Sequence, residues 1–428
     1  MKRFSIATLL VATLASAVLA QNDTAAWVAW TRANHFPIAS IVSTPQDDFA
    51  DLRFFKDVIG ERRLVQLGES GHGVGQFDSA KVRLIKFFHE QMGFDVIAFE
   101  SSIYECFAAN ASATSGVDML QRSIFTVWAT EEVRPLFDYI QATQRSDHPL
   151  LLAGFDTQIS SPRGVAGRPV FLRRVVAAID SGYADEVASF DATFINALRG
   201  TQVDPAKWDE SEAFYDRLDQ FFREHRDGLV EAFPGDPAPV IAERTAYSMV
   251  RYIRQLRTQA ARPTDAGPEG AGAVRDAGMA DNLTALARDV YPERKILIWA
   301  HNFHIRYANA STTSIQPTMG AIVAERFRPD LYTIGLYMNQ GSAAYNNRTI
   351  YLIKPAISDS MEWVLANTGP ASLFVDFLHQ RQEQGNGWMF QPMSTREWGT
   401  TPLVLVPREQ YDGVLLIDRV TPPNYLRF

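Results

Sequence analysis

Four short, almost uninterrupted apolar runs, separated by longer amphipathic segments, constrain the fold of this chain more than any other feature. The runs are Leu64–Leu67, Asp95–Phe99, Leu150–Phe155 and Lys295–Ala300. Such runs are typical of strands buried on both faces, as in a parallel sheet. Segments Phe77–Glu90 and Glu131–Gln144 lie between them and have helical periodicity. The alternation predicts an α/β fold with a mostly parallel central sheet, flanked by helices and joined by right-handed crossovers.

The middle of the chain follows a different pattern. Between Phe171 and Ala261 there is no convincing strand, whereas Phe214, Leu218 and Phe222 recur at helical spacing between charged residues. Apolar residues at this spacing predict amphipathic helices. We therefore expect a helical subdomain, about residues 171–272, inserted between the third and fourth strands, with the Pro- and Gly-rich segment 262–272 as its return linker.

More strands follow the fourth run. Leu331–Tyr337 and Thr349–Ile353 are separated by a polar turn and predict a hairpin, and Leu403–Val406 and Val414–Ile417 predict two late strands. The chain has no internal repeat. We therefore predict that residues 21–428 form one α/β domain that carries the helical insert.

The N-terminal segment has the pattern of a secretory signal peptide. Lys2 and Arg3 precede an apolar run from Ile6 to Leu19, and small residues end it at Ala20. This run is shorter than the roughly 20 residues that a membrane-spanning helix needs, so cleavage is favoured over anchoring. We expect residues 1–20 to be removed and the mature protein to be periplasmic or secreted, without a membrane segment.

Composition excludes several classes of function. Against 49 Asp and Glu residues there are 41 Lys and Arg, a net charge of −8 without a basic stripe, which argues against a nucleic-acid partner. Cys106 is the one cysteine, which excludes an internal disulfide and a cysteine-rich metal site. The eight histidines leave a histidine and carboxylate metal site open.

Ionisable side chains follow all four apolar runs. The residues concerned are Glu69 and His72 after the first, Glu100 after the second, Asp156 after the third, and His301 and His304 after the fourth. Ligands of open α/β sheets bind at the carboxyl edge of the strands. Charges at the ends of buried strands also need partners. Together these positions predict a functional site at that edge.

Each of these residues also has a structural interpretation. Glu69 could bond loop amides, Asp156 could cap a helix, and His304 could only orient a neighbour. His72 lies between two glycines, where no hydrophobic pattern holds it. We therefore favour a functional role for His72, and for His301 as well.

Three further charged residues are candidates for supporting roles. Lys81 lies on the apolar stripe of its helix, where a charged side chain needs a reason. Lys81 either has a functional role or extends its ammonium group to the surface. Arg275 could clamp a substrate oxygen or pair with Asp276. Glu132 lies in a predicted first helical turn, where acidic residues are common.

The motifs present favour direct activation of water. Gly68-Glu69-Ser70-Gly71-His72 differs from the nucleophile elbow because a histidine replaces its last glycine. Neither a zinc-protease helix motif nor a P-loop occurs. Histidine and carboxylates without an evident nucleophile suggest general-base catalysis.

The ordered set of motifs resembles the erythromycin esterase family. The matching stretches are Leu67–Gly73, Lys81, Gly93–Glu100, Trp128 with Thr130 and Glu132, Gly154–Gln158, Arg275–Asn282, Trp299–Asn302 and Tyr411–Val414. They cover most of the chain in order. The resemblance implies a hydrolase that opens a small-molecule ester or macrolactone, as in macrolide resistance, and that needs no metal or other cofactor.

The resemblance also implies roles for individual residues. His72 corresponds to the base that activates water, Glu69 sets its tautomer and pKa, and His301 polarises the carbonyl or stabilises the oxyanion. The remaining candidates would bind or support the substrate: Lys81, Glu100, Glu132, Asp156, Arg275 and His304. One departure is Gln76, where the pattern has an acid four residues after the loop histidine.

Two alternatives to a hydrolase stay open at the level of sequence. His72, Glu69, Glu100 and His301 are competent ligands for a metal or haem. A binding module with a degenerate site is the other alternative. The separation of His72 and His301 discriminates, because they must lie close enough for a carbonyl and a water to bridge them.

Overall fold

The computed structural model describes residues 24–199, 207–261, 270–308 and 317–427. The predicted signal peptide, residues 1–20, and residues 262–269 of the predicted return linker lie outside this part. Within the described residues no helix is long and apolar enough to cross a membrane.

The chain is built around a nine-stranded mixed sheet, in which the order is β1-β8-β11-β6-β2-β5-β3-β4 and β7 pairs with β6. Its strands are β1 (Phe36–Pro37), β2 (Leu64–Leu67), β3 (Phe94–Ser102), β4 (Leu151–Asp156), β5 (Lys295–Trp299), β6 (Leu331–Ala344), β7 (Ile350–Ile353), β8 (Ser372–Asp376) and β11 (Gly413–Val420). The six strands from β11 to β4 are parallel, and β1, β7 and β8 pair antiparallel. The predicted α/β class and its mostly parallel sheet are confirmed.

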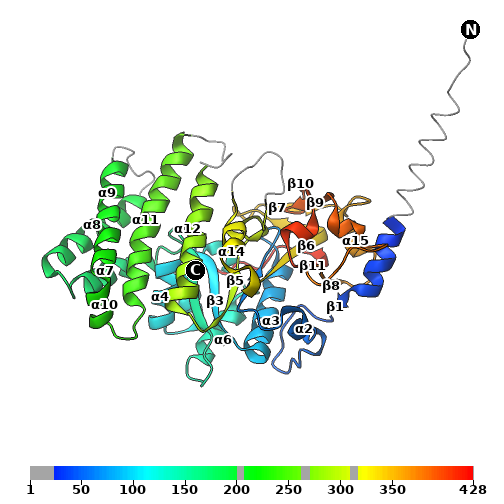
Figure 1. Cartoon of the computed structure of the whole chain (residues 1–428), viewed down its shortest axis with the longest axis horizontal. Helices are drawn as coiled ribbons and strands as arrows, with labels where there is room; N and C mark the ends of the chain where they lie inside the picture. Colours follow the sequence, from blue (N-terminus) through cyan, green and yellow to red (C-terminus); the bar gives the residue numbers. More distant parts are fainter. Residues whose placement is uncertain (1–23, 200–206, 262–269, 309–316, 428) are drawn as a thin grey trace, which may run out of the picture.

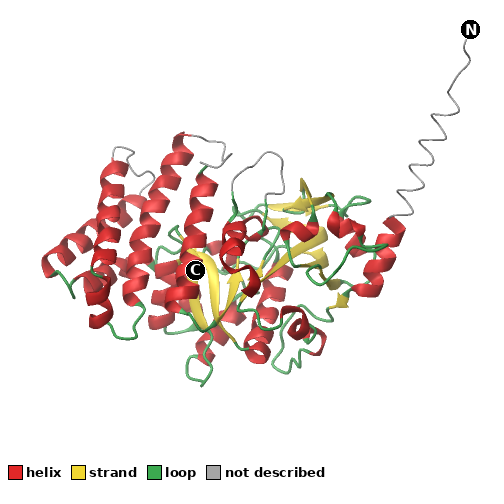
Figure 2. Ribbon diagram, viewed as in Figure 1, coloured by secondary structure: helices red, strands yellow, loops and turns green. Residues whose placement is uncertain are grey.

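Helices cover both faces of this sheet (Figures 1 and 2). On one face, α3 (Gly75–Met92) and α6 (Arg134–Thr143) pack on strand residues such as Leu67 and Phe99. On the other face, α12 (Ala271–Ala285), α14 (Met319–Phe327) and α15 (Met361–Ala366) pack on alternate residues of the same strands. The two cores explain why the strands are apolar at nearly every position.

Helices with a separate core lie between β4 and β5, at the left of Figure 1. They are α7 (Arg168–Val176), α8 (Ser181–Arg199), α9 (Trp208–Glu224), α10 (Arg226–Ala232) and α11 (Ala238–Ala261). Phe214, Leu218 and Phe222 are buried in this core, as their helical spacing predicts. Buried Arg168 holds α7 to α8 through a 2.7 Å ion pair with Asp191.

The late strands form two hairpins of different kinds. β6 and β7 pair antiparallel within the main sheet, as predicted. In contrast, β9 (Met393–Glu397) and β10 (Thr401–Leu405) form a separate two-stranded sheet. The predicted strand Leu403–Val406 therefore belongs to a hairpin outside the main sheet, and β9 was not predicted at all. Trp398 and Gly399 make its turn with positive φ angles of 55° and 66°.

Candidate active site

Two loops that follow neighbouring strands carry the central histidines. β2 and β5 are parallel neighbours in the sheet, with Leu67 opposite Trp299. The backbone N–H of Asn302 donates to the carbonyl of Glu69 at 2.8 Å, which joins the two loops directly. As a result, the rings of His72 and His301 lie 5.0 Å apart between centroids. The two loops therefore bring the imidazole rings into edge-to-face contact.

The glycines of the first loop allow other parts of the protein to approach it closely. A Cβ on Gly68 would lie 1.9 Å from Oδ1 of Asn302, and one on Gly73 would lie 2.0 Å from the carbonyl oxygen of Ala344. Both positions require glycine for steric reasons. The loop therefore packs closely against Asn302 of the neighbouring loop and against Ala344 of β6.

Glu69 fixes the orientation of His72. Its fully buried carboxylate lies 2.6 Å from Nδ1 of His72 and also accepts from the Trp128 indole at 2.9 Å, both through Oε1. Lys81 donates to Oε2 at 2.5 Å. Since an ionised carboxylate only accepts, Nδ1 of His72 carries the proton and Nε2 keeps its lone pair. A lone pair on Nε2 is what a general base needs.

Lys81 is part of the site and does not snorkel to the surface. Its side chain is completely buried, and Nζ lies 4.2 Å from the ring centroid of Trp299. Burial lowers the pKa of the Lys81 ammonium, while the charge of Glu69 acts in the opposite direction. The neighbouring Asp78 is also buried, and burial together with Glu69 raises its pKa well above the usual range.

His301 is held in the opposite tautomer. It is the N-cap of α13 (Asn302–Ile305), and its Nδ1 accepts the backbone N–H of Phe303 at 3.0 Å. The neutral ring must therefore carry its proton on Nε2, which has no hydrogen-bond partner in the part of the chain that the structure describes. Burial and the charges of His72 and His304 hold the pKa of His301 well below 6.5. His301 is thus a neutral donor.

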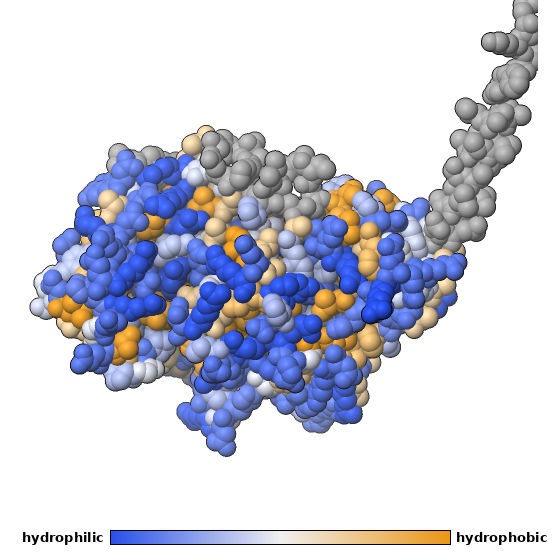
Figure 3. Space-filling model, viewed as in Figure 1, coloured by the Kyte–Doolittle hydropathy of each residue, from blue (hydrophilic) through white to orange (hydrophobic). Residues whose placement is uncertain are grey.

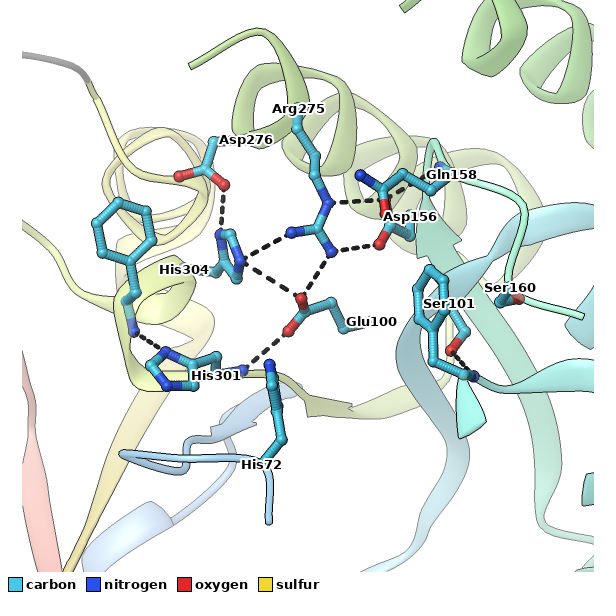
Figure 4. Close-up of polar contacts among 12 residues, drawn as sticks. His72, Glu100, Ser101, Asp156, Gln158, Ser160, Arg275, Asp276, His301 and His304 are labelled. Atoms are coloured by element: carbon cyan, nitrogen blue, oxygen red, sulfur yellow. Dashed lines mark hydrogen bonds and ion pairs between the residues drawn. The ribbon is translucent and has the colours of Figure 1, made fainter. Parts of the chain in front are cut away.

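A buried ion cluster lies behind the histidines (Figure 4). Arg275 donates to Glu100 at 2.7 Å and to the two oxygens of Asp156 at 3.1 and 2.5 Å. The other oxygen of Glu100 accepts the backbone N–H of His301 at 2.9 Å. Burial acts to raise the pKa of Glu100, but His304 and Arg275 outweigh it and hold this pKa well below its usual range.

His304 links this cluster to the next helix. Its Nδ1 lies 2.5 Å from Asp276, and its Nε2 lies 3.1 Å from Arg275 and 3.4 Å from Glu100. Burial opposes the charged ring, but Asp276 and Glu100 together raise the pKa of His304. Asp276 therefore pairs with His304, so the alternative in which Arg275 pairs with Asp276 is wrong. Asp156 accepts from Arg275 and from the backbone N–H of Gln158.

Glu132 lies elsewhere and holds the C-terminal tail. Its carboxylate accepts the backbone and side-chain N–H groups of Asn424, with the side-chain bond at 2.7 Å. Gln76, the departure from the family pattern, similarly accepts the backbone N–H of Thr421 at 2.6 Å. Both residues therefore anchor the C-terminal tail. Glu132 is not among the residues that line the cleft of His72 and His301, although it was expected to support the substrate.

An open cleft of about 440 Å³ lies in front of the two histidines. Its lining is His72, His301, Phe303, His304, Glu397, Trp398 and Thr401. Glu397 and Trp398, which come from the β9–β10 hairpin, were not predicted as site residues. Only the Trp-Gly pair at residues 398–399, typical of a tight turn, could have drawn attention to this segment.

Possible metal ligands are arranged as hydrogen-bonded pairs. Across the described ranges, no group of three or more His, Cys, Asp or Glu side chains is placed to hold a metal ion.

Comparisons with known proteins agree with this architecture. The model of the family described as erythromycin esterase matches residues 89–420. "Putative hydrolase YbfO" of Bacillus subtilis strain 168 is 32% identical over 399 residues, 87% of each chain. A crystal structure from Bacillus cereus has a TM-score of 0.77 at 16% identity and covers 94% of this chain and 99% of its own. An erythromycin esterase EreC mutant in its open conformation has a TM-score of 0.70 at 18% identity, covering 92% and 100%.

Proposed function

Because the chain belongs to the erythromycin esterase family, we propose that it is an exported hydrolase that opens a small-molecule carboxylic ester or macrolactone by direct attack of water. The observation that carries this proposal is a pair of histidines in opposite tautomers that line the same open cleft, with their ring centroids 5.0 Å apart. Export rests on the signal-peptide pattern of residues 1–20.

His72 acts as the general base. Its free Nε2 takes a proton from water as the water oxygen attacks the carbonyl carbon, and the ring becomes an imidazolium. Glu69 stabilises this cation through its contact with Nδ1 at 2.6 Å. Lys81 and Trp128 hold Glu69 in place, so the carboxylate cannot rotate away. A base held in this way contributes typically ~10²–10⁴-fold to the rate.

His301 stabilises the oxyanion. His301 lines the cleft and its Nε2–H has no partner among the described residues, so it can donate to the carbonyl oxygen as negative charge develops there. The depressed pKa keeps the ring neutral, with the proton on the atom that donates. Removing one such donor typically costs ~10²–10³ in kcat.

Glu100, Arg275, Asp156 and His304 form the support of this site. Glu100 holds the backbone N–H of His301, and Arg275 holds Glu100. The cluster therefore fixes the His301 loop. The substrate that we propose is a small molecule, because the cleft of about 440 Å³ is of the size that holds one.

Hydrolysis of defined esters tests the proposal. The purified protein would be incubated with erythromycin, ethyl butyrate and 4-nitrophenyl butyrate. Mass spectrometry would detect the addition of one water to erythromycin and the release of butyric acid from the two butyrates. We expect the wild type to be active and His72→Ala to lose turnover while its circular dichroism stays unchanged. His148→Ala is the matched control, because His148 stacks on His89 and precedes β4, away from the cleft. Turnover of His72→Ala at the wild-type rate would contradict the mechanism.

A further inference from the structure

Glu397 lines the cleft and has a carboxyl oxygen without a hydrogen-bond partner among the described residues. The residue ends β9 at the turn of the hairpin and lines the cleft together with His72 and His301. Its Oε2 lies 3.8 Å from Nε2 of His301, too far for a hydrogen bond, and within the described part of the chain both atoms are buried without a partner. Buried polar atoms without partners are rare, so each needs an explanation, and beside a cleft a polar group of the bound substrate is one.

The surroundings of Glu397 favour its protonated form. Burial raises the pKa of the Glu397 carboxyl, although Arg306 and His304 act in the opposite direction. Arg306 donates to Oε1 at a rather long 3.3 Å. Since Oε1 accepts this bond, the proton of the neutral acid belongs on Oε2, the oxygen that has no partner among the described residues.

Ester hydrolysis at this site needs such an acid. An alkoxide leaves poorly unless it receives a proton as the carbon–oxygen bond breaks. His72 has taken its proton from water by then, and its Nδ1–H stays in contact with Glu69. A carboxyl that burial keeps protonated, in the same cleft as a histidine that serves as the base, is an arrangement in which acid and base roles are divided.

We propose, on the basis of the hydrolytic function above, that Glu397 is the acid that protonates the departing alcohol oxygen. Water adds to the carbonyl carbon, one of its protons moves to Nε2 of His72, and His301 Nε2–H bonds the resulting oxyanion. The bond from carbon to the alcohol oxygen then breaks, and its electron pair takes the proton from Oε2 of Glu397. The products are the carboxylic acid and the alcohol, and a proton passes from His72 to Glu397 through solvent to restore both groups.

The hairpin holds Glu397 firmly enough for this role. The backbone N–H of Trp398 donates to the Ser70 carbonyl at 2.5 Å, which ties the turn to the His72 loop. The hydroxyl of Tyr351 donates to the Trp398 carbonyl at 2.8 Å. Buried Glu362 of α15 accepts from the hydroxyl of Thr395 and from the next backbone N–H, at 2.8 and 2.9 Å.

Two esters of the same acid test the inference. Ethyl butyrate releases an alkoxide that needs a proton, whereas 4-nitrophenyl butyrate releases a phenolate that does not. In Glu397→Gln, which can still accept from Arg306, we expect kcat for the ethyl ester to fall ~10²–10³-fold and kcat for the nitrophenyl ester to stay within about threefold. The alkaline decline of the wild-type rate should be present with the ethyl ester and absent with the nitrophenyl ester.

A positioning control separates the chemistry from the geometry. Glu362→Ala loosens the hairpin without removing the acid, so both esters should slow by the same factor. Equal losses for both esters in Glu397→Gln, or no loss for either, would overturn the role of Glu397 while leaving the hydrolase proposal intact. If the wild type cleaves neither these esters nor erythromycin, the hydrolase proposal fails and the role of Glu397 fails with it.

Discussion

Glu69→Gln tests how the site selects the tautomer of His72. In the wild type, Oε1 of Glu69 contacts two N–H groups, from His72 and Trp128, and Oε2 accepts from Lys81. A glutamine has one oxygen for three donors. If the glutamine oxygen faces His72, the glutamine N–H₂ faces the Lys81 ammonium, which lies 2.5 Å from that position in the wild type. If the glutamine amide is flipped, its N–H₂ faces Nδ1 of His72 and forces the imidazole proton to Nε2. Either arrangement disrupts the base.

The structure gives the magnitude of this effect. At 2.5 Å and an effective dielectric of about 20, the Glu69–Lys81 attraction is roughly 7 kcal/mol, and desolvation offsets part of it. Both side chains are fully buried, so removing one partner should cost ~3–5 kcal/mol of unfolding free energy. A wrong tautomer in a hydrogen-bonded carboxylate–histidine pair lowers kcat by about 10⁴-fold. We expect losses of this order for Glu69→Gln.

The double variant Glu69→Gln/Lys81→Met makes the test specific. Methionine removes the ammonium, so the glutamine oxygen can face His72 and Trp128 while its N–H₂ faces the thioether. We expect the double variant to be more stable than either single variant by ~1–3 kcal/mol, and to recover at least about tenfold of the turnover that Glu69→Gln loses.

Urea unfolding of the four proteins measures the coupling, and hydrolysis of the active ester measures recovery. Two results would refute the reasoning. One is additivity of the two single effects on unfolding free energy within about 0.5 kcal/mol. The other is a Glu69→Gln enzyme that keeps kcat within about tenfold of the wild type, since the tautomer would then not depend on Glu69.

Three further predictions follow from single contacts. His301→Asn keeps a side chain that can cap the Phe303 N–H but loses the ring donor, so kcat should fall ~10²–10³-fold with unchanged thermal stability, and an unchanged kcat would exclude the oxyanion role. Glu105 has a pKa of about 7, raised by burial from 4.5, so the folded state holds this proton longer than the unfolded chain and stability should decline between pH 4.5 and 7. In urea titrations at pH 5 and 8, Glu105→Gln should therefore gain stability relative to wild type at the higher pH, and an equal difference at both would contradict this. Arg275→Met leaves Glu100 and a second buried carboxylate without their cation, and should cost ~3–5 kcal/mol of unfolding free energy at pH 7, whereas a loss under about 1 kcal/mol would show that other groups compensate.

The sheet and the strand-end residues could be predicted because their signals are local. A strand buried on both faces must be apolar at nearly every position, so β2 and β5 are visible in the sequence without knowledge of their neighbours. The end of such a strand is equally visible, and Glu100 and Asp156 were therefore found. Their partner Arg275 was expected either to clamp a substrate oxygen or to pair with Asp276, and its pairing with Glu100 and Asp156 depends on contacts between distant segments that its local sequence does not encode.

Glu397 and Trp398 could not be predicted, because their role depends on long-range packing. The β9–β10 hairpin is amphipathic only weakly, and most residues of β10 are exposed or half-buried. Its position comes from contacts with distant segments, such as the bond from the Trp398 N–H to the Ser70 carbonyl. No periodicity of the hairpin itself encodes that contact, and a glutamate at a turn is common on any protein surface.

The two central histidines show why residue type alone does not determine a catalytic role. Nδ1 of His72 faces a carboxylate, which requires a donor there, so Nε2 is left as a base. Nδ1 of His301 faces a backbone N–H, which requires an acceptor there, so Nε2 is left as a donor. His301 contacts a backbone N–H because it follows β5 and is the N-cap of α13. His72 contacts a carboxylate because Glu69 lies three positions earlier in the same loop. Exchanging the two local partners would exchange the two roles, so the division between base and oxyanion donor resides in the hydrogen bonds to Nδ1 rather than in the histidines themselves.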